Sequence, residues 1–316
     1  MGMRVFVLGA TGVVGRRAVG ELVGAGHEVT GLARSVDAAA RLRGLGAQAA
    51  EADPFDEAQL RRVLARHEAQ AVVNLMTHVP PSTRAMWARA WRENDSLRRV
   101  ASGVVARAAR GAGAQRLVQE SLILNYPDAG SEWIGEDVKL APVGPASGAA
   151  VAEAHARRFG DAVVLRFASF YGPDSEQSLA QLAWARRGWS LHPARGDAFT
   201  SMVWLDDAAS GVLAALRAPP GAYNVVEQEP LTRAQADDAL AAVVGRTHLR
   251  SPLSGVARRF AVARALSRSQ RVSAERLREA TGWSPRVRSP REGWPRLVAT
   301  VERERGAQTP AVDPRG

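Results

Sequence analysis

The chain has 316 residues, enough for a large core, and no cysteine, which excludes disulfide bonds and thiolate metal sites. Its formal net charge of +10 would suit a nucleic acid, but the arginines come as scattered pairs without a long basic run or a basic-aromatic platform, so we expect no nucleic-acid partner. No apolar run approaches the roughly 18 residues that a membrane span needs, and we expect a cytoplasmic protein without a membrane partner.

The first predicted element is a short apolar strand at residues 3–8, which runs into three glycines and then into a helical pattern. Gly9 allows a tight turn, Gly12 lets the backbone approach a pyrophosphate, and Gly15 lets the helix pack close to the strand. The positive end of the helix then faces the phosphates. The segment therefore predicts a dinucleotide-binding turn, with cofactor contacts from Gly9, Thr11, Gly12, Val13, Val14 and Gly15.

Strands and helical patterns then alternate, which is the sequence form of a doubly wound parallel sheet. The further strands are predicted at 27–33, 47–51, 70–75, 115–120, 162–168 and 222–226. The stretch 84–112 predicts one long helix or two, and 205–217 predicts a helix that flanks the sheet. We expect residues 1–169 to form this α/β domain, with residues 203–228 returning to it.

From about Phe170 the pattern loosens, and helices are predicted near 176–188, 232–245 and 273–281. We expect residues 170–202 and 229–305 to form a smaller, mostly helical domain that covers the substrate. The basic stretch 251–270 predicts a surface helix. Residues 306–316 contain turn formers and few apolar residues, so we expect a disordered tail.

Several segments along the chain carry a resemblance to a known superfamily. They are Gly9–Gly15, Ala52–Asp56 after the third strand, Ala71–Leu75, Asn94, Arg116–Ser121 with Tyr126, Leu165–Pro173 and Val203–Ala208. Together they resemble the extended short-chain dehydrogenase/reductase superfamily, and within it the NAD-dependent epimerase/dehydratase family. The resemblance implies a Rossmann domain, a nicotinamide cofactor and a small-molecule substrate. It also implies a homodimer through the regions 84–112 and 149–159.

The residues after the second strand bear on the choice of cofactor. NAD enzymes place an acid there that binds the adenosine ribose 2′-hydroxyl, and the alignment puts Ala33 at that position with Arg34 after it. An arginine would pair with a 2′-phosphate, so we expect NADP(H) rather than NAD(H). Asp53 is the candidate for the adenine amino group, the alternative being that it only caps the helix near Asp56. The remaining expected cofactor contacts are Pro54, Asn74, Leu75 and Met76.

The catalytic groups of the superfamily are a Tyr-x-x-x-Lys pair on a helix and a Ser at the end of the fifth strand. Aligning the chain on residues 152–153 puts Pro145 at the Tyr position and Ala149 at the Lys position. Aligning the fifth strand puts Leu122 at the Ser position, with Ser121 one residue earlier. All three usual groups are therefore expected to be absent, although a positioned acid/base contributes about 10²–10⁴ in rate.

Three side chains are candidates to replace them. Lys139 is the only lysine of the chain and has an amine that can lose its proton, unless it is an ordinary surface lysine beside acids. Tyr126 could donate a proton, or could have only a packing role. Ser121 ends a strand at the edge of the sheet where ligands bind in such folds. The six histidines show no metal-ligand spacing, so no metal is expected.

Two functions remain compatible with these residues. The first is a reductase, epimerase or dehydratase that uses NADP(H) and relocated acid/base groups on a hydroxyl- or carbonyl-bearing small molecule. A nucleotide sugar or a secondary-metabolite intermediate would be such a substrate. The second is a protein that binds NADP(H) as a sensor or regulator, without turnover.

Overall fold

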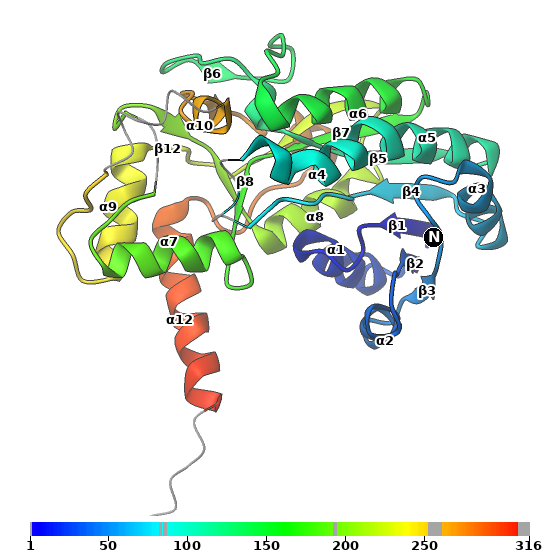
Figure 1. Cartoon of the computed structure of the whole chain (residues 1–316), viewed down its shortest axis with the longest axis horizontal. Coiled ribbons are helices and arrows are strands. Elements are labelled where there is room, and N and C mark those ends of the chain that lie inside the picture. The colour runs from blue at the N-terminus through cyan, green and yellow to red at the C-terminus, as the bar shows by residue number, and fades with distance from the viewer. Residues whose placement is uncertain (1, 82–83, 85–86, 192–194, 252–260, 309–316) are drawn as a thin grey trace, which may run out of the picture.

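The computed structural model describes residues 2–81, 84, 87–191, 195–251 and 261–308. Its centre is a sheet of seven parallel strands in the order β11-β7-β5-β4-β1-β2-β3 (Figure 1). These strands are β1 (Arg4–Leu8), β2 (Glu28–Leu32), β3 (Gln48–Ala50), β4 (Ala71–Asn74), β5 (Arg116–Leu122), β7 (Ala162–Phe167) and β11 (Gly221–Val225). The predicted doubly wound sheet is confirmed, and each of its strands lies within two residues of the predicted bounds.

The strand order reverses beside β1, because β2 pairs with one side of it and β4 with the other. The two strand ends meet closely there, since the amide of Leu75, just after β4, donates to the carbonyl of Leu8 at 2.9 Å. In open parallel sheets ligands bind at the carboxyl edge at such a reversal. The topology therefore places the candidate site at the ends of β1 and β4.

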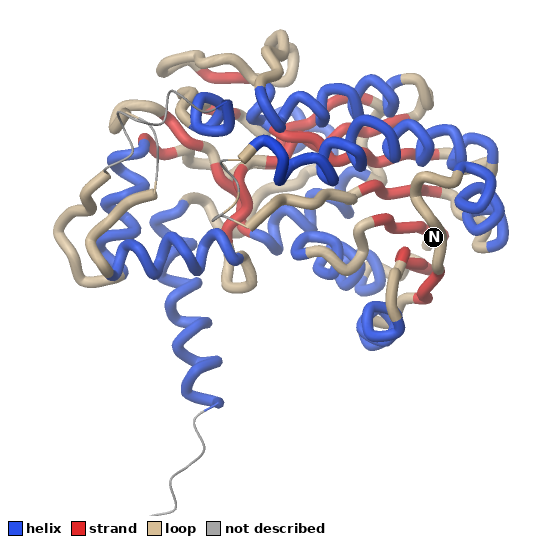
Figure 2. The backbone as a smooth tube through the Cα atoms, viewed as in Figure 1, coloured by secondary structure: helices blue, strands red, loops and turns tan. Residues whose placement is uncertain are grey.

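Helices cover both faces of the sheet, which Figure 2 shows as a central layer of strands between helical layers. One apolar core joins the sheet to α1 (Val13–Gly24), α2 (Val36–Gly44) and α8 (Leu205–Ala215). The other joins it to α3 (Glu57–Arg66), α5 (Ser102–Gly111) and α6 (Ser147–Arg157). In α1, Gly15, Ala18, Val19 and Leu22 are buried, which is the spacing of one helix face.

The later part of the chain forms a third core beside the sheet. It contains side chains of α7 (Glu176–Arg186), α9 (Arg233–Val243) and α12 (Pro290–Gln308), together with buried Tyr171, Trp204 and Trp294. α12 extends away from the rest of the molecule (Figure 1). Two shorter helices, α10 (Ala261–Leu266) and α11 (Glu275–Thr281), complete the helices of this part that the structure describes.

Three pairs of short strands were not predicted from the sequence. β8 (Ser169–Tyr171) pairs with β10 (Met202–Trp204), β9 (Phe199–Thr200) with β12 (Leu231–Thr232), and β6 (Trp133–Ile134) with β13 (Arg271–Val272). Strands of two or three residues are too short to show a periodic pattern. The division into residues 1–169 with 203–228 and a covering domain of 170–202 and 229–305 stays a prediction.

Several predicted helices differ from the structure at their ends. The stretch 84–112 begins its helical run only at Ala88 and divides into a 3₁₀ turn (Ala88–Trp91), α4 (Arg92–Ser96), a π-helical turn (Leu97–Ala101) and α5. Of the predicted surface helix 251–270, residues 252–260 lie outside the described residues and α10 is the helical part.

The predicted disordered tail 306–316 is wrong at its beginning, because α12 continues to Gln308. Residues 309–316 lie outside the described residues. The sequence missed α12 because Pro290, Gly293 and Pro295 look like helix breakers. Pro290 is in fact the first residue of the helix, where proline costs no hydrogen bond.

Candidate functional site

The glycine turn between β1 and α1 has the shape that a phosphate site requires. Gly9 has a φ of +77°, and a side chain there would collide with the backbone of Leu75, whose carbonyl carbon and oxygen lie 2.6 Å from an added Cβ. An added Cβ on Gly15 would lie 2.0 Å from the carbonyl oxygen of Gly9. Apart from its chain neighbours, a Cβ added at Gly12 has that same oxygen, at 3.2 Å, as its one contact within 4 Å among the described residues. The space above Gly12 is therefore open toward a ligand.

The start of α1 offers uncompensated backbone donors. Gly12 is its N-cap and makes no side-chain cap hydrogen bond, and the first turn contains no acidic residue. Thr11 is exposed beside it. The amino end of a helix attracts anions through its free N–H groups and its dipole. Turn and helix together fit the pyrophosphate of a dinucleotide.

The predicted adenosine end of the site also lies at the carboxyl edge. Arg34 is exposed just after β2, directly before Ser35, which caps α2 by accepting a hydrogen bond from the amide of Ala38. Among the described residues the guanidinium of Arg34 has no hydrogen bond or ion pair, so it is available to a phosphate. Asp53 is exposed after β3 and accepts from the amide of Phe55 at 2.9 Å. The cap of α3 is Asp56 instead, so the alternative role for Asp53 is wrong.

The end of β4 carries the next three predicted contacts. Asn74 is buried, donates to the side-chain oxygen of Gln119 at 2.9 Å and accepts from the amide of Met76 at 3.2 Å. Its side chain therefore fixes the backbone that follows β4. Leu75 is buried, Met76 is partly buried, and Pro54 after β3 is partly buried. Direct cofactor contacts from these residues stay a prediction.

At the end of β5 the predicted Ser121 belongs to a buried ionic network. Its hydroxyl donates to Glu153 Oε1 at 2.6 Å. Arg166 binds both oxygens of Glu153 at 2.9 Å, and Arg157 adds a third donor at 2.7 Å. Burial opposes the charge of Arg166, but the hydrogen bonds and charge of Glu153 outweigh it and raise the pKa of Arg166. Ser121 is fully buried, so its hydroxyl serves this network.

Tyr126 is joined to the same network from the other side. Its hydroxyl donates to Asn224 Oδ1 at 2.8 Å and accepts from Arg166 Nη1 at 2.8 Å, and no part of the residue is exposed. Burial raises the pKa of Tyr126 to about 12, although Arg166 acts in the opposite direction. With both its bonds made inside the protein, this hydroxyl is poorly placed to exchange a proton with a ligand.

The positions where the superfamily has Tyr and Lys lie at the beginning of α6. Pro145 is in the 3₁₀ turn Gly144–Ala146 that leads into the helix, and Ala149 is fully buried. Neither side chain carries a proton that could be transferred. Lys139 lies in the segment between β6 and α6, where it is exposed and has no ion pair among the described residues.

A second buried ion pair that the sequence did not predict joins Arg98 to Glu120, with Nη2 and Oε1 2.5 Å apart. Glu120 precedes Ser121, and Arg98 lies in the π-helical turn, a feature that often marks functional sites. Within the described residues, Glu120 Oε2 and Arg98 Nε have no hydrogen-bond partner. Burial raises the pKa of Glu120 more than Arg98 lowers it. Only the fold distinguishes Arg98 from the many surface arginines.

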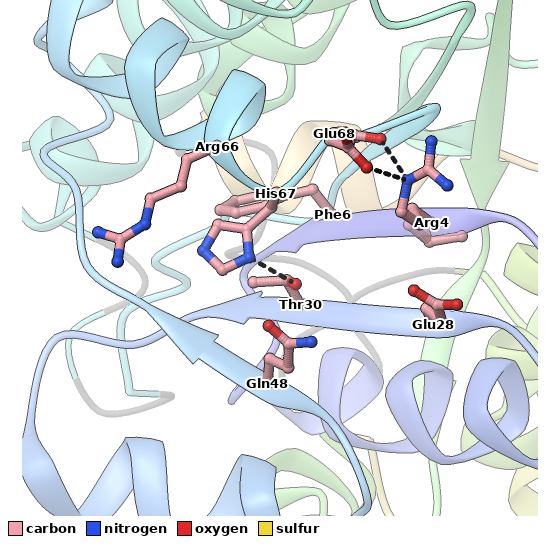
Figure 3. A pocket seen from close by; sticks show the side chains of 10 residues that line it. Arg4, Phe6, Glu28, Thr30, Gln48, Arg66, His67 and Glu68 are labelled. Carbon is pink, nitrogen blue, oxygen red and sulfur yellow. Dashed lines mark hydrogen bonds and ion pairs between the residues drawn. The ribbon is translucent and has the colours of Figure 1, made fainter.

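A polar cavity of about 200 Å³ lies at the opposite, amino edge of the strands (Figure 3). Arg4 and Glu28, at the first residues of β1 and β2, line it, with His67 after α3. The His67 ring lies 3.3 Å from the Thr30 hydroxyl, from Nδ1 to Oγ1. Because the glycine turn follows the other end of β1, this cavity is separate from the dinucleotide site.

The described part of the chain contains neither a metal-binding cluster nor a membrane-spanning helix. No group of three or more His, Asp or Glu residues is arranged to hold a metal ion. None of the described helices is long and apolar enough to cross a membrane.

Comparison with known proteins agrees with this geometry. Residues 5–225 match the NAD dependent epimerase/dehydratase family. The chain belongs to this family. It is 30% identical over 315 residues to the 3-diazoavenalumate denitrifying reductase of a Streptomyces species, with 92% of the chain and 99% of that relative covered. The family predicted from the sequence is thus confirmed, and membership supports a nicotinamide dinucleotide as the ligand of the glycine turn.

Solved structures share the fold of this epimerase/dehydratase chain. Human epimerase family protein SDR39U1 (isoform 2) with NADPH has a TM-score of 0.77 and 23% identity, covering 94% of this chain and 99% of that one. DesIV, the dTDP-glucose 4,6-dehydratase of Streptomyces venezuelae, with NAD bound, also has a TM-score of 0.77, with 20% identity and coverage of 98% and 99%.

Proposed function

We propose that the protein is an NADP(H)-dependent reductase that delivers hydride to a substrate whose reduction takes no proton from the protein. An aryl diazonium carboxylate is the substrate class we infer. The observation that supports this most directly is the burial of the candidate proton-transfer groups. The hydroxyls of Ser121 and Tyr126 are bound within a buried network, and the sequence predicts Pro145 and Ala149 at the Tyr and Lys positions.

The chemistry of the two substrate classes explains why this observation matters. Reduction of a carbonyl needs a hydride on carbon and a proton on oxygen, and the positioned acid is worth about 10²–10⁴ in rate. Reduction of an aryl diazonium group needs only the hydride. The new C–H bond takes the electron pair of the hydride, and N₂ leaves with the electron pair of the C–N bond. The charges balance without an acid, and the 30% identical relative is named as a denitrifying reductase of a diazo compound.

The cofactor end supports NADP(H) rather than NAD(H). When bound, NADPH supplies the hydride. The chain's own contribution is the open backbone at Gly12, the start of α1 without a side-chain cap, and the guanidinium of Arg34, which has no partner among the described residues. An acid in place of Ala33 would repel a 2′-phosphate, whereas Arg34 can bind it through two hydrogen bonds.

The experiment is a turnover assay with NADPH that carries deuterium at C4 of the nicotinamide. Purified protein is given an arenediazonium carboxylate in one arm and matched aldehydes and ketones in another, with enzyme-free mixtures to subtract the background reaction. We expect deuterium in the arene, one N₂ released for each NADPH oxidised, and no turnover of the carbonyl compounds. The Gly12→Val variant is the control that must lose the activity.

The proton-free step is tested by pH and by three conservative variants. We expect kcat to be nearly constant between about pH 6 and 8. We also expect the variants Ser121→Ala, Tyr126→Phe and Lys139→Met to keep kcat within about twofold of wild type, because none of these side chains acts as an acid or base. A fall of about 10² or more in one variant would assign that side chain a catalytic role. Tight NADPH binding without turnover of any substrate would instead favour a non-catalytic dinucleotide-binding protein.

A further inference from the structure

A cluster of four charged side chains joins the first helix to the covering part of the molecule. Arg16 Nη2 and Arg17 Nη2 both bind Asp174 Oδ2, at 2.7 and 2.5 Å. Arg17 Nε also binds Asp206 Oδ1 at 2.7 Å. Burial alone would raise the pKa of Asp174, but the hydrogen bonds from the two arginines outweigh it and lower the pKa. The carboxylate is therefore ionised at neutral pH.

The two arginines lie next to the proposed phosphate site. They follow Gly15 directly in α1, and a helix rises about 1.5 Å per residue, so they lie within roughly a turn of the glycines. Arg17 is only 17% exposed and also donates to the carbonyl of Val13 at 3.2 Å. Its guanidinium is thus held close to the start of the helix, where a pyrophosphate would add two negative charges.

The acid belongs to a hydrogen-bonded turn that starts α7. Asp174 lies between Gly172 and Ser175, and the amide of Gly172 donates to the hydroxyl of Ser178 at 3.2 Å. Ser175 caps α7 by accepting from the amide of Ser178. Movement of Asp174 would therefore carry the beginning of α7 with it.

We propose that Asp174 acts as an internal anion that competes with the phosphates of the dinucleotide for Arg16 and Arg17, and so sets the cofactor affinity. This inference rests on the proposed dinucleotide site. The carboxylate neutralises part of the positive charge beside the glycine turn, and charges at such distances interact measurably at moderate salt. By reciprocity, a bound dinucleotide weakens the hold of α1 on the segment 172–178 and on the start of α7.

The test measures NADPH affinity by calorimetry in the whole protein, with Asp174→Asn against wild type. Removing one negative charge should tighten binding by roughly two- to fivefold at low salt, and the gain should vanish near 0.5 M salt because exposed charges are screened. Glu21→Gln is the matched control: it removes an acid from the same helix farther from the turn, where Glu21 pairs only loosely with Arg286 at 3.8 Å. We expect this control to leave the affinity unchanged.

A second variant shows whether Asp174 acts through the arginines. In an Arg17→Gln background, NADPH binding is weaker and the gain from Asp174→Asn should shrink, since the group for which the two anions compete is gone. If Asp174→Asn melts like wild type but binds NADPH no more tightly, the role of Asp174 as a competing anion is overturned, and the proposed function is unaffected. Absence of NADPH binding in wild type would overturn the proposed function, and this inference with it.

Discussion

The two ends of the candidate site are built differently. At the end of β1 the site is made of backbone. Gly9, Gly12 and Gly15 shape the turn, and α1 begins without a side-chain cap or an acidic residue in its first turn. At the end of β5 the site is made of side chains. The Glu153–Arg166 ion pair hydrogen-bonds the hydroxyls of Ser121 and Tyr126. The end at β1 is the one proposed to bind the cofactor. At the end of β5, Ser121 and Tyr126, the candidate proton-transfer groups, are part of the buried core.

The largest effect should come from breaking the ionic network. Glu153→Ala leaves Arg166 buried without its main partner, which should lower the free energy of unfolding by about 3–5 kcal/mol. Urea denaturation measures this loss. The control is Arg157→Ala, which removes an exposed partner of the same carboxylate and should cost less than about 1 kcal/mol. Equal losses in both variants would mean that the network does not hold the core together.

The next effect belongs to the glycine turn. Gly12→Val should weaken NADPH binding by roughly 100-fold, about 3 kcal/mol, because the side chain would fill the space of the pyrophosphate. The melting temperature should change little, since an added Cβ meets only the Gly9 oxygen. Gly20→Val is the matched control in the same helix, where an added Cβ meets nothing within 4 Å. Unchanged NADPH binding in Gly12→Val would show that the turn shapes the fold but does not contact the cofactor.

A smaller effect distinguishes the two cofactors. Arg34→Ala should weaken NADPH binding about tenfold and leave NADH binding unchanged, because only NADPH carries the 2′-phosphate. Calorimetric titration of both cofactors gives the ratio. Arg43→Ala, an exposed arginine at the other end of α2, serves as the control. Equal binding of NADPH and NADH by the wild type would show that Arg34 does not bind the 2′-phosphate.

The smallest effect concerns the cavity of Figure 3, which lies away from both ends of the site. Burial and then the charge of Arg66 lower the pKa of His67, so folding favours the neutral ring. This stabilisation is present above the unfolded value of about 6.5 and is lost as the pH falls through the lower folded pKa. The difference in melting temperature between wild type and His67→Gln should therefore narrow from pH 7.5 to 5.5. NADPH affinity should be the same in both, and a constant difference in melting temperature would exclude His67 as the titrating group.

Much of the fold could be predicted because it repeats a local pattern. The seven main strands are apolar runs separated by helices, and the glycine turn is contiguous in the sequence, so both could be identified without long-range contacts. The expected absence of Tyr and Lys at Pro145 and Ala149 also rests on a local motif, and it stays a prediction. The short strand pairs and α12 could not be predicted. Strands of two or three residues that pair across about 30 to 140 residues leave no periodic signal, and a helix that begins at proline hides its start.

The roles of individual polar residues were the harder part. Ser121 and Tyr126 looked like chemical groups because they follow a strand at the ligand edge, but their partners Glu153, Arg166 and Asn224 come from three other elements. Only the packed sheet brings these together. The contact of Asp174 with Arg16 and Arg17 could not be predicted for the same reason. The arginines lie more than 150 residues earlier, and the residues around Asp174 in the sequence do not indicate them.

The position of β11 has a consequence for how the protein folds as it is made. β11 closes one edge of the sheet beside β7, yet more than 50 residues separate the two strands in the chain. Asn224, the acceptor for Tyr126, sits on β11. A growing chain that has emerged only as far as residue 220 thus has an open sheet edge and a buried tyrosine hydroxyl without its acceptor. The core is completed only when this strand has been made, and until then the unpaired edge of β7 can pair with other chains.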